Sequence, residues 1–147
     1  DVVELVTAAR DAFFHACVQL RPGQRIGDVS HAIQTFAEAR GYGVVRDFVG
    51  HGIGRELHEA PQIPNVGSRR SGPVIPAGAT LAIEPMITMG DYHICVGDDK
   101  WTVSTADGLP CAHYENTVLV TDNGCEILTV VEDEVRHESS SVSKENM

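Results

Sequence analysis

Apolar side chains recur every three or four residues along the first part of the chain, which is the spacing of an amphipathic helix. The pattern covers residues 2–20 and stops at Arg21-Pro22-Gly23, a sequence that favours a turn. It resumes at Asp28, which we expect to be the N-cap of a second helix, and runs to Arg40. Gly41 follows, where helices often end in a left-handed residue. The chain therefore predicts two helices, each with an apolar face that must pack on another element.

Beyond these helices the pattern changes to short β-branched and apolar runs that predict strands. Turn sequences separate them at Asp107-Gly108 and at Asp122-Asn123-Gly124, where a hairpin is predicted. Residues 67–79 are rich in Gly, Pro and Ser and are predicted to form a loop. Two helices followed by a mostly antiparallel sheet give an α+β fold. The predicted strands are 43–49, 80–88, 101–105, 111–121 and 125–131.

Composition narrows the classes of function. A chain of 147 residues is expected to hold one domain, which we place at residues 1–131. Residues 132–147 have few apolar side chains and a run of serines, so we predict a disordered tail there. The net charge of −10 argues against nucleic acid or a membrane as partner, because both need clustered Lys and Arg. No apolar run approaches the roughly 20 residues of a membrane-spanning helix, and we expect a cytoplasmic protein.

A glycine-rich stretch, Gly50-His51-Gly52-Ile53-Gly54, precedes a second histidine, His58. Glycine permits backbone conformations that other residues avoid and allows close approach to a neighbour, so we expect a flexible loop that aims both histidines. A histidine in a loop is more often an ordinary polar residue than a ligand, and His51 alone is weak evidence for a metal. The HExxH motif of zinc peptidases is excluded, because Gln62 replaces its second histidine and Pro61 would break its helix.

Two glutamates lie in otherwise apolar surroundings. Glu84 interrupts a predicted strand, where a carboxylate must be paired, bind a metal or shift its pKa. Pro85 follows and cannot donate to a strand ladder, so the strand should end or bulge there. Further along, strand alternation places His113, Glu115 and Thr117 on one face. One histidine with two glutamates suits Mn, Fe(II), Co or Zn, and paired carboxylates can bridge two ions. The residues alone leave an ordinary structural role open for each.

Three segments resemble, in the same order, the signature segments of type I methionine aminopeptidases. They read GHGIGRELHEAPQIPN, IEPMITMG and DGLPCAHYENTVLVTDNGCEILT, and the similarity extends over residues 1–131. The resemblance implies the pita-bread fold shared by creatinase and these aminopeptidases. It implies hydrolytic removal of the initiator methionine from nascent proteins, assisted by two divalent metal ions (Co, Mn, Fe(II) or Zn). It also implies a cytoplasmic monomer that acts on nascent polypeptide N-termini at the ribosome.

The same resemblance assigns roles to the candidate residues. His51 and Glu84 would bind one metal ion, and Glu115 would bridge both ions. Glu84 would also relay protons during catalysis. His58 would hydrogen-bond the scissile peptide and stabilise its developing oxyanion. The site expected from the resemblance therefore divides into metal ligands and one substrate-polarising histidine.

The resemblance also points to two substrate-binding residues, and two positions differ from the residues usual in the family. Trp101 matches a tryptophan near the methionine side-chain pocket, and Leu57 stands where that pocket often has an aromatic residue. The family usually has Gln at position 113 and often His at 116, whereas this chain has His113 and Asn116. His113 faces the same way as Glu115, so we expect it to support the ligands from outside the metal site.

The family also has two aspartate ligands upstream of its histidine, and this chain has no such pair before His51. We therefore interpret the chain as the C-terminal part of a catalytic domain that lacks its N-terminal half-sheet, and we expect it to be inactive alone. One alternative is a non-catalytic pita-bread module that binds ribosomes or chromatin proteins. Retention of His51, Glu84 and Glu115 argues against it. A prolidase-like peptidase is the other alternative, and the form of the histidine segment argues against that.

Overall fold

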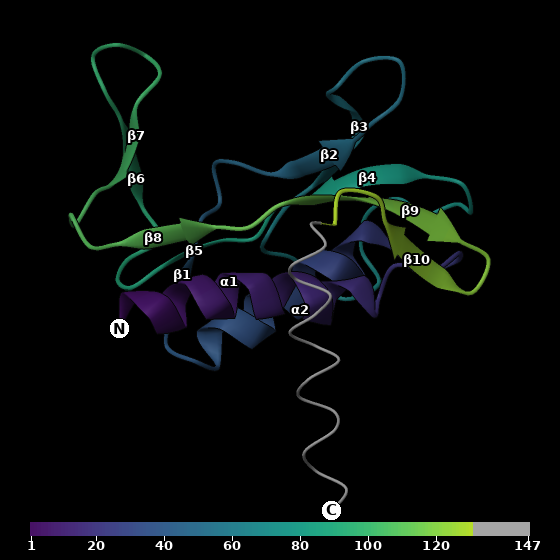
Figure 1. The fold of residues 1–147 in the computed structure, drawn as a ribbon, viewed down its shortest axis with the longest axis horizontal. Helices are drawn as coiled ribbons and strands as arrows, with labels where there is room; N and C mark the ends of the chain where they lie inside the picture. The colour runs from purple at the N-terminus through teal and green to yellow at the C-terminus, as the bar shows by residue number, and fades with distance from the viewer. Residues whose placement is uncertain (131–147) are drawn as a thin grey trace, which may run out of the picture.

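The computed structural model describes residues 1–130 and confirms an α+β fold, with the helices on one side of antiparallel sheets (Figure 1). The predicted tail at 132–147 lies outside the described residues. No helix within residues 1–130 is long and apolar enough to cross a membrane. The elements are α1 (Val2–Cys17), α2 (Ile26–Glu38), β1 (Gly43–Val44), β2 (Gly50–Gly52), β3 (Glu59–Ile63), β4 (Thr80–Ile83), β5 (Met86–Thr88), β6 (Ile94–Val96), β7 (Val103–Thr105), β8 (Cys111–His113), β9 (Asn116–Thr121) and β10 (Gly124–Ile127).

Helix α1 ends at Cys17, before the predicted end at Leu20. It begins with a capping box, in which the Asp1 carboxylate accepts the N–H of Glu4 and the Glu4 carboxylate accepts from the Asp1 amino group. At the other end, the N–H of Leu20 reaches back only to the carbonyl of Cys17, so the chain leaves the α-helix in a tighter turn. Leu20 is still fully buried. Its burial explains why the apolar pattern ran past the end of the helix.

Helix α2 begins at Ile26, and the prediction of Asp28 as its N-cap is wrong. Asp28 lies in the first turn, where its carboxylate accepts the N–H groups of Arg25 at 3.0 Å and Arg70 at 2.9 Å. The bond to Arg70 ties the start of the helix to the loop before β4. The boundary therefore depends on a contact with a distant part of the chain, which local sequence signals do not contain.

Within residues 1–130, the strands form two sheets linked by interrupted strands and a separate hairpin. The long sheet has the order β10-β9-β4-β2-β3, the short sheet has the order β1-β5-β8, and β6 pairs with β7. The chain passes from β4 of the long sheet to β5 of the short sheet across Glu84-Pro85. It returns from β8 to β9 across Tyr114-Glu115. The predicted strands 80–88 and 111–121 are therefore each broken in the middle.

The remaining strand predictions were partly right. The strand predicted at 43–49 is reduced to β1, the one at 101–105 begins at Val103, and the one at 125–131 corresponds to β10. The hairpin between β9 and β10 forms as predicted. Strands β2, β3 and β6 were missed. Strand β3 contains Pro61, which is tolerated there because β3 is the edge strand of the long sheet within residues 1–130.

The hydrophobic core fills the space between the helices and the long sheet. Alternate residues of β4 and β9, such as Leu81, Ile83 and Val118, point into it, so the residues between them point to the opposite face. A smaller cluster, which includes Leu5 and Ile87, lies between the helices and the short sheet. The helices thus cover one face of the sheets, and the polar residues of interest occupy the other.

Replacing Asp28 with asparagine should lower the free energy of unfolding by about 1 kcal/mol near pH 7. The carboxylate accepts backbone N–H groups from Arg70 and Arg25, and these bonds hold the pKa of Asp28 below its ordinary value. A depressed folded-state pKa gives stability that is fully present above the pKa of the unfolded chain, near 4. That stability is lost as the pH falls through the lower folded-state pKa.

Urea unfolding of the wild type and Asp28→Asn at about pH 7 and about pH 3 checks this prediction. The difference between the two proteins should shrink at the lower pH. Asp11→Asn is the matched control, because Asp11 is a partly exposed helical carboxylate paired with the neighbouring Arg10. This variant should change stability by less than about 0.5 kcal/mol. A difference for Asp28→Asn that is the same at both pH values would contradict the prediction.

Candidate metal centre

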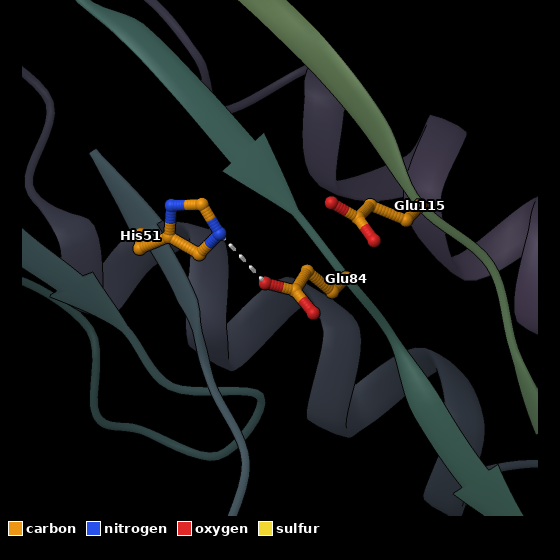
Figure 2. A group of neighbouring side chains, drawn as sticks. All are labelled: His51, Glu84 and Glu115. Carbon is orange, nitrogen blue, oxygen red and sulfur yellow. Dashed lines mark ion pairs between the residues drawn. The ribbon is translucent and has the colours of Figure 1, made fainter. Parts of the chain in front are cut away.

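His51, Glu84 and Glu115, predicted as metal ligands, come together on the face of the sheets away from the helices. His51 pairs across the long sheet with Ala82, two residues before Glu84, so both side chains lie on this face. The three side chains point toward one another (Figure 2). One ligand atom from each lies within 4.8 Å of the others. We call these residues the donor cluster.

The glycines around His51 allow close packing rather than flexibility. Residues 50–52 form the strand β2, so the prediction of a loop is wrong there, whereas residues 53–58 lie between β2 and β3 outside any strand. Neither Gly50 nor Gly52 has a positive φ. A Cβ on Gly50 would collide with the carbonyl of Ala82, and one on Gly52 with the carbonyl of Ala60. Close approach, the second reason given for these glycines, is confirmed.

The orientation of His51 is fixed by its own strand. The side chain is buried, and its Nδ1 lies 3.0 Å from the carbonyl oxygen of Gly52. A carbonyl oxygen can only accept, so Nδ1 carries the proton and Nε2 presents a lone pair. Nε2 lies 3.4 Å from Oε1 of Glu84. A lone pair on Nε2 and the carboxylate oxygen can both bind a cation that lies between them. The donor cluster therefore fits a divalent ion that takes nitrogen and oxygen ligands.

His113 reaches the donor cluster from the short sheet. Its Nε2 lies 3.3 Å from Oε2 of Glu84 and 3.8 Å from Oε2 of Glu115. The hydrogen bond with Glu84 raises the pKa of His113, and the charges of both carboxylates add to the rise against the opposing effect of burial. Asn116, the other departure from the family, is buried and accepts a hydrogen bond from the hydroxyl of Thr129 at 2.6 Å. Its contacts are structural.

The predicted substrate residues differ in their relation to the site. The ring centroid of His58 lies 4.3 Å from that of His51, and the His58 side chain is exposed. Trp101, also exposed, lines a cavity of about 750 Å³ that reaches Glu84. Leu57 is exposed and is not among the described residues that line this cavity.

The cavity lies between the short sheet and the β6–β7 hairpin, directly beside the donor cluster. Phe48 and Met86 contribute to its apolar wall, and neither was singled out from the sequence. Glu84 and His113 form its polar end. The site thus combines a metal-binding group with an adjoining apolar space.

Asn65 is a further residue that sequence reasoning missed. It is 1% exposed, and its Nδ2 donates to the backbone carbonyl of Glu84 at 3.0 Å. Pro85 follows Glu84 and has no N–H, so the ladder is interrupted at this point. Asn65 anchors the chain there and thereby positions Glu84. The two residues are far apart in sequence, and no local signal links them.

The pattern that defines metallopeptidase family M24 matches residues 1–122. The chain belongs to metallopeptidase family M24. This M24 chain is 48% identical over 132 residues to the methionine aminopeptidase of Clostridium acetobutylicum, covering 90% of the chain and 53% of that protein. It is 50% identical over 128 residues to that of Clostridium perfringens, covering 87% of the chain and 51% of that protein. The chain spans about half the length of these curated relatives.

Solved structures agree with the family assignment. The M24 chain superposes on methionine aminopeptidase from Thermotoga maritima with a TM-score of 0.86 and 53% identity, covering 88% of this chain and 52% of that one. Prolidase from Pyrococcus furiosus gives a TM-score of 0.67 and 26% identity, covering 88% and 33%. The predicted resemblance to methionine aminopeptidases and the predicted pita-bread architecture are confirmed.

Replacing Asn65 with alanine should lower the free energy of unfolding by about 1–3 kcal/mol, because the buried carbonyl of Glu84 loses its donor. It should also weaken binding of Mn(II) about tenfold or more, because Glu84 is no longer held in place. Urea unfolding and calorimetric titration with Mn(II) measure the two effects. Asn123→Ala in the exposed β9–β10 turn is the control. Unchanged Mn(II) affinity in a folded Asn65→Ala protein would contradict the positioning role.

Proposed function

We propose that the protein to which this chain belongs removes N-terminal methionine from polypeptides by metal-assisted peptide hydrolysis. The observation that carries the proposal is the donor cluster, with its ligand atoms within 4.8 Å of one another beside an apolar cavity. The similarity to methionine aminopeptidases supports the choice of reaction. Because the chain spans about half of these relatives, the activity is proposed for the whole protein.

The donor cluster would hold two divalent ions, of Co, Mn, Fe(II) or Zn. Such ions polarise a peptide carbonyl and lower the pKa of water toward neutrality, which supplies both an electrophile and a nucleophile. Nε2 of His51 and the carboxylates of Glu84 and Glu115 are the ligands that this chain contributes. The Gly52 carbonyl keeps the His51 ring turned so that Nε2 faces the cluster.

Glu84 would transfer a proton, and His58 would hydrogen-bond the substrate. Glu84 is mostly buried, belongs to the donor cluster and lines the cavity. Its carboxylate can accept a proton from the attacking water and return it to the leaving amine. His58, exposed beside the ring of His51, would donate an N–H to the oxygen of the scissile carbonyl as negative charge develops there. Glu84 would thus transfer the proton, and His58 would stabilise the negative charge on the carbonyl oxygen.

The apolar cavity would receive the methionine side chain. Its volume of about 750 Å³ suits a small apolar ligand, and Trp101, Phe48 and Met86 supply apolar surface. Leu57, exposed next to His58, would contact the substrate outside this cavity. The substrates we propose are nascent polypeptides met at the ribosome, and the expected monomeric state and cytoplasmic location belong to the same proposal.

The alternatives are less well supported. A non-catalytic binding module has no need of a donor cluster, and here the ligand atoms converge. A prolidase-like activity agrees less well with the comparisons, because identity to the prolidase structure is 26% against 53% for a methionine aminopeptidase structure.

Replacing Glu84 with glutamine should lower methionine release at least about 100-fold, because the amide cannot take up the proton. The chain should be joined to the part of the Clostridium acetobutylicum relative that it does not match, and methionine release from a Met-Ala-Ser peptide measured with Co(II) or Mn(II). Glu126→Gln, at an exposed position on β10, is the control and should keep full activity. A folded, metal-loaded chimera that releases no methionine would contradict the proposed function.

Replacing His58 with asparagine should lower kcat about 100-fold while metal affinity stays within about twofold, because His58 acts on the substrate rather than on the ion. The same chimera and peptide, together with calorimetric metal titration, measure both quantities. His93→Asn is the matched control, because His93 is an exposed histidine that pairs with Asp91 and belongs to neither the donor cluster nor the cavity lining. An equal loss of metal affinity and activity in His58→Asn would place His58 among the ligands instead.

A further inference from the structure

Each carboxylate oxygen of Glu84 faces a different imidazole. Oε1 lies 3.4 Å from Nε2 of His51, and Oε2 lies 3.3 Å from Nε2 of His113. The imidazole of His113 also lies 3.8 Å from Oε2 of Glu115. Figure 2 shows Glu84 with one oxygen toward His51 and the other directed away from it. His113 therefore faces Oε2 of Glu84 at nearly the same distance as His51 faces Oε1.

The two histidines reach Glu84 from different sheets. His51 lies on β2 of the long sheet, and His113 is the last residue of β8 in the short sheet, paired with Met86 just beyond Glu84-Pro85. The break that separates the sheets thus places Glu84 between them. His51 is buried and His113 is about half exposed.

The distances at Glu84 also fit the coordination of a metal ion shared by the imidazole and the carboxylate. Two ligands of one tetrahedral ion, each about 2.0–2.2 Å from the metal, lie roughly 3.3–3.6 Å apart. A charge-assisted bond between an imidazolium and a carboxylate is shorter, about 2.7–2.9 Å. The separations of 3.3 Å and 3.4 Å at Glu84 fall in the first range.

We propose that His113 is a metal ligand, so that the metal centre has a second imidazole nitrogen beside Glu84 and Glu115. This inference rests on the proposed function, because it adds a ligand to the same metal centre. The centre then has two imidazole nitrogens among its carboxylate oxygens. Such a set favours Co(II), Fe(II) or Zn(II) over harder ions such as Mn(II) or Mg(II).

The test uses the 147-residue chain and its His113→Gln variant, titrated calorimetrically with Co(II) and with Mn(II). His113→Gln should lower Co(II) affinity at least about tenfold and Mn(II) affinity less, because an amide oxygen is the harder ligand. His93→Gln is the matched control, because it also removes a histidine next to a carboxylate, at 2.8 Å from Asp91. It should bind both ions as the wild type does.

A second measurement needs no variant at position 113. In the Co(II)-loaded wild type, proton NMR should show a paramagnetically shifted, exchangeable imidazole N–H for each bound histidine. Signals from two histidines that persist in His58→Asn support His51 and His113 as the pair. A signal from one histidine, or unchanged Co(II) affinity in His113→Gln, would overturn the inference and leave the metal centre in place. Co(II) binding that is absent from the wild type, or unaffected by His51→Ala, would instead overturn the metal centre itself.

Discussion

The site depends on one backbone hydrogen bond, in which the N–H of Tyr114 donates to the carbonyl of Pro85 at 3.1 Å. On one side of it, β4 pairs with β9 through Ile83 and Asn116. On the other side, β5 pairs with β8. The bond holds two interrupted strands together where neither ladder continues. Pro85 makes the interruption obligatory because it has no N–H to offer. Glu84 and Glu115 are the residues next to this bond, so the break that divides the sheets also delivers both carboxylates to one place.

Helix α1 packs against the strand break from the core side of the sheets. The ring of Tyr114 lies 5.4 Å from that of Phe13, which is fully buried in the core under the long sheet. Ile83 is also fully buried, and strand alternation then directs the next residue, Glu84, to the opposite face. Turning Glu84 toward the helices would expose Ile83, at a cost of about 1.5–3 kcal/mol. The orientation of the polar site is therefore set by apolar burial on the other face of the same strands.

Much of the donor cluster was predictable because its signals are local. A carboxylate in an apolar strand before a proline is visible in the sequence, and alternation correctly grouped His113 with Glu115. The position of the strand breaks was not predictable, because it depends on which strands become neighbours. Strand β3, the anchoring of Glu84 by Asn65 and the Arg70 contact at the start of α2 could not be predicted for the same reason. Each depends on residues far apart in the sequence. For the glycines beside His51, composition could not separate conformational freedom from close packing. The neighbouring carbonyls decide it, and they lie in other strands.

The apolar cavity adjoins the donor cluster at Glu84, so a ligand in the cavity changes the surroundings of that carboxylate. Trp101 and Met86 line the cavity. Glu84 lines it too and belongs to the donor cluster, and His113 lines it beside Glu84. An apolar side chain that fills the cavity displaces water from one flank of Glu84, and electrostatic interactions strengthen as water is excluded. Under the proposed function, binding of the side chain and activation of the neighbouring peptide would be coupled through Glu84. A chain end with a small or polar first residue would leave the cavity wet and lose part of that effect. Under the proposed function, selectivity for the first residue would then affect the rate as well as binding.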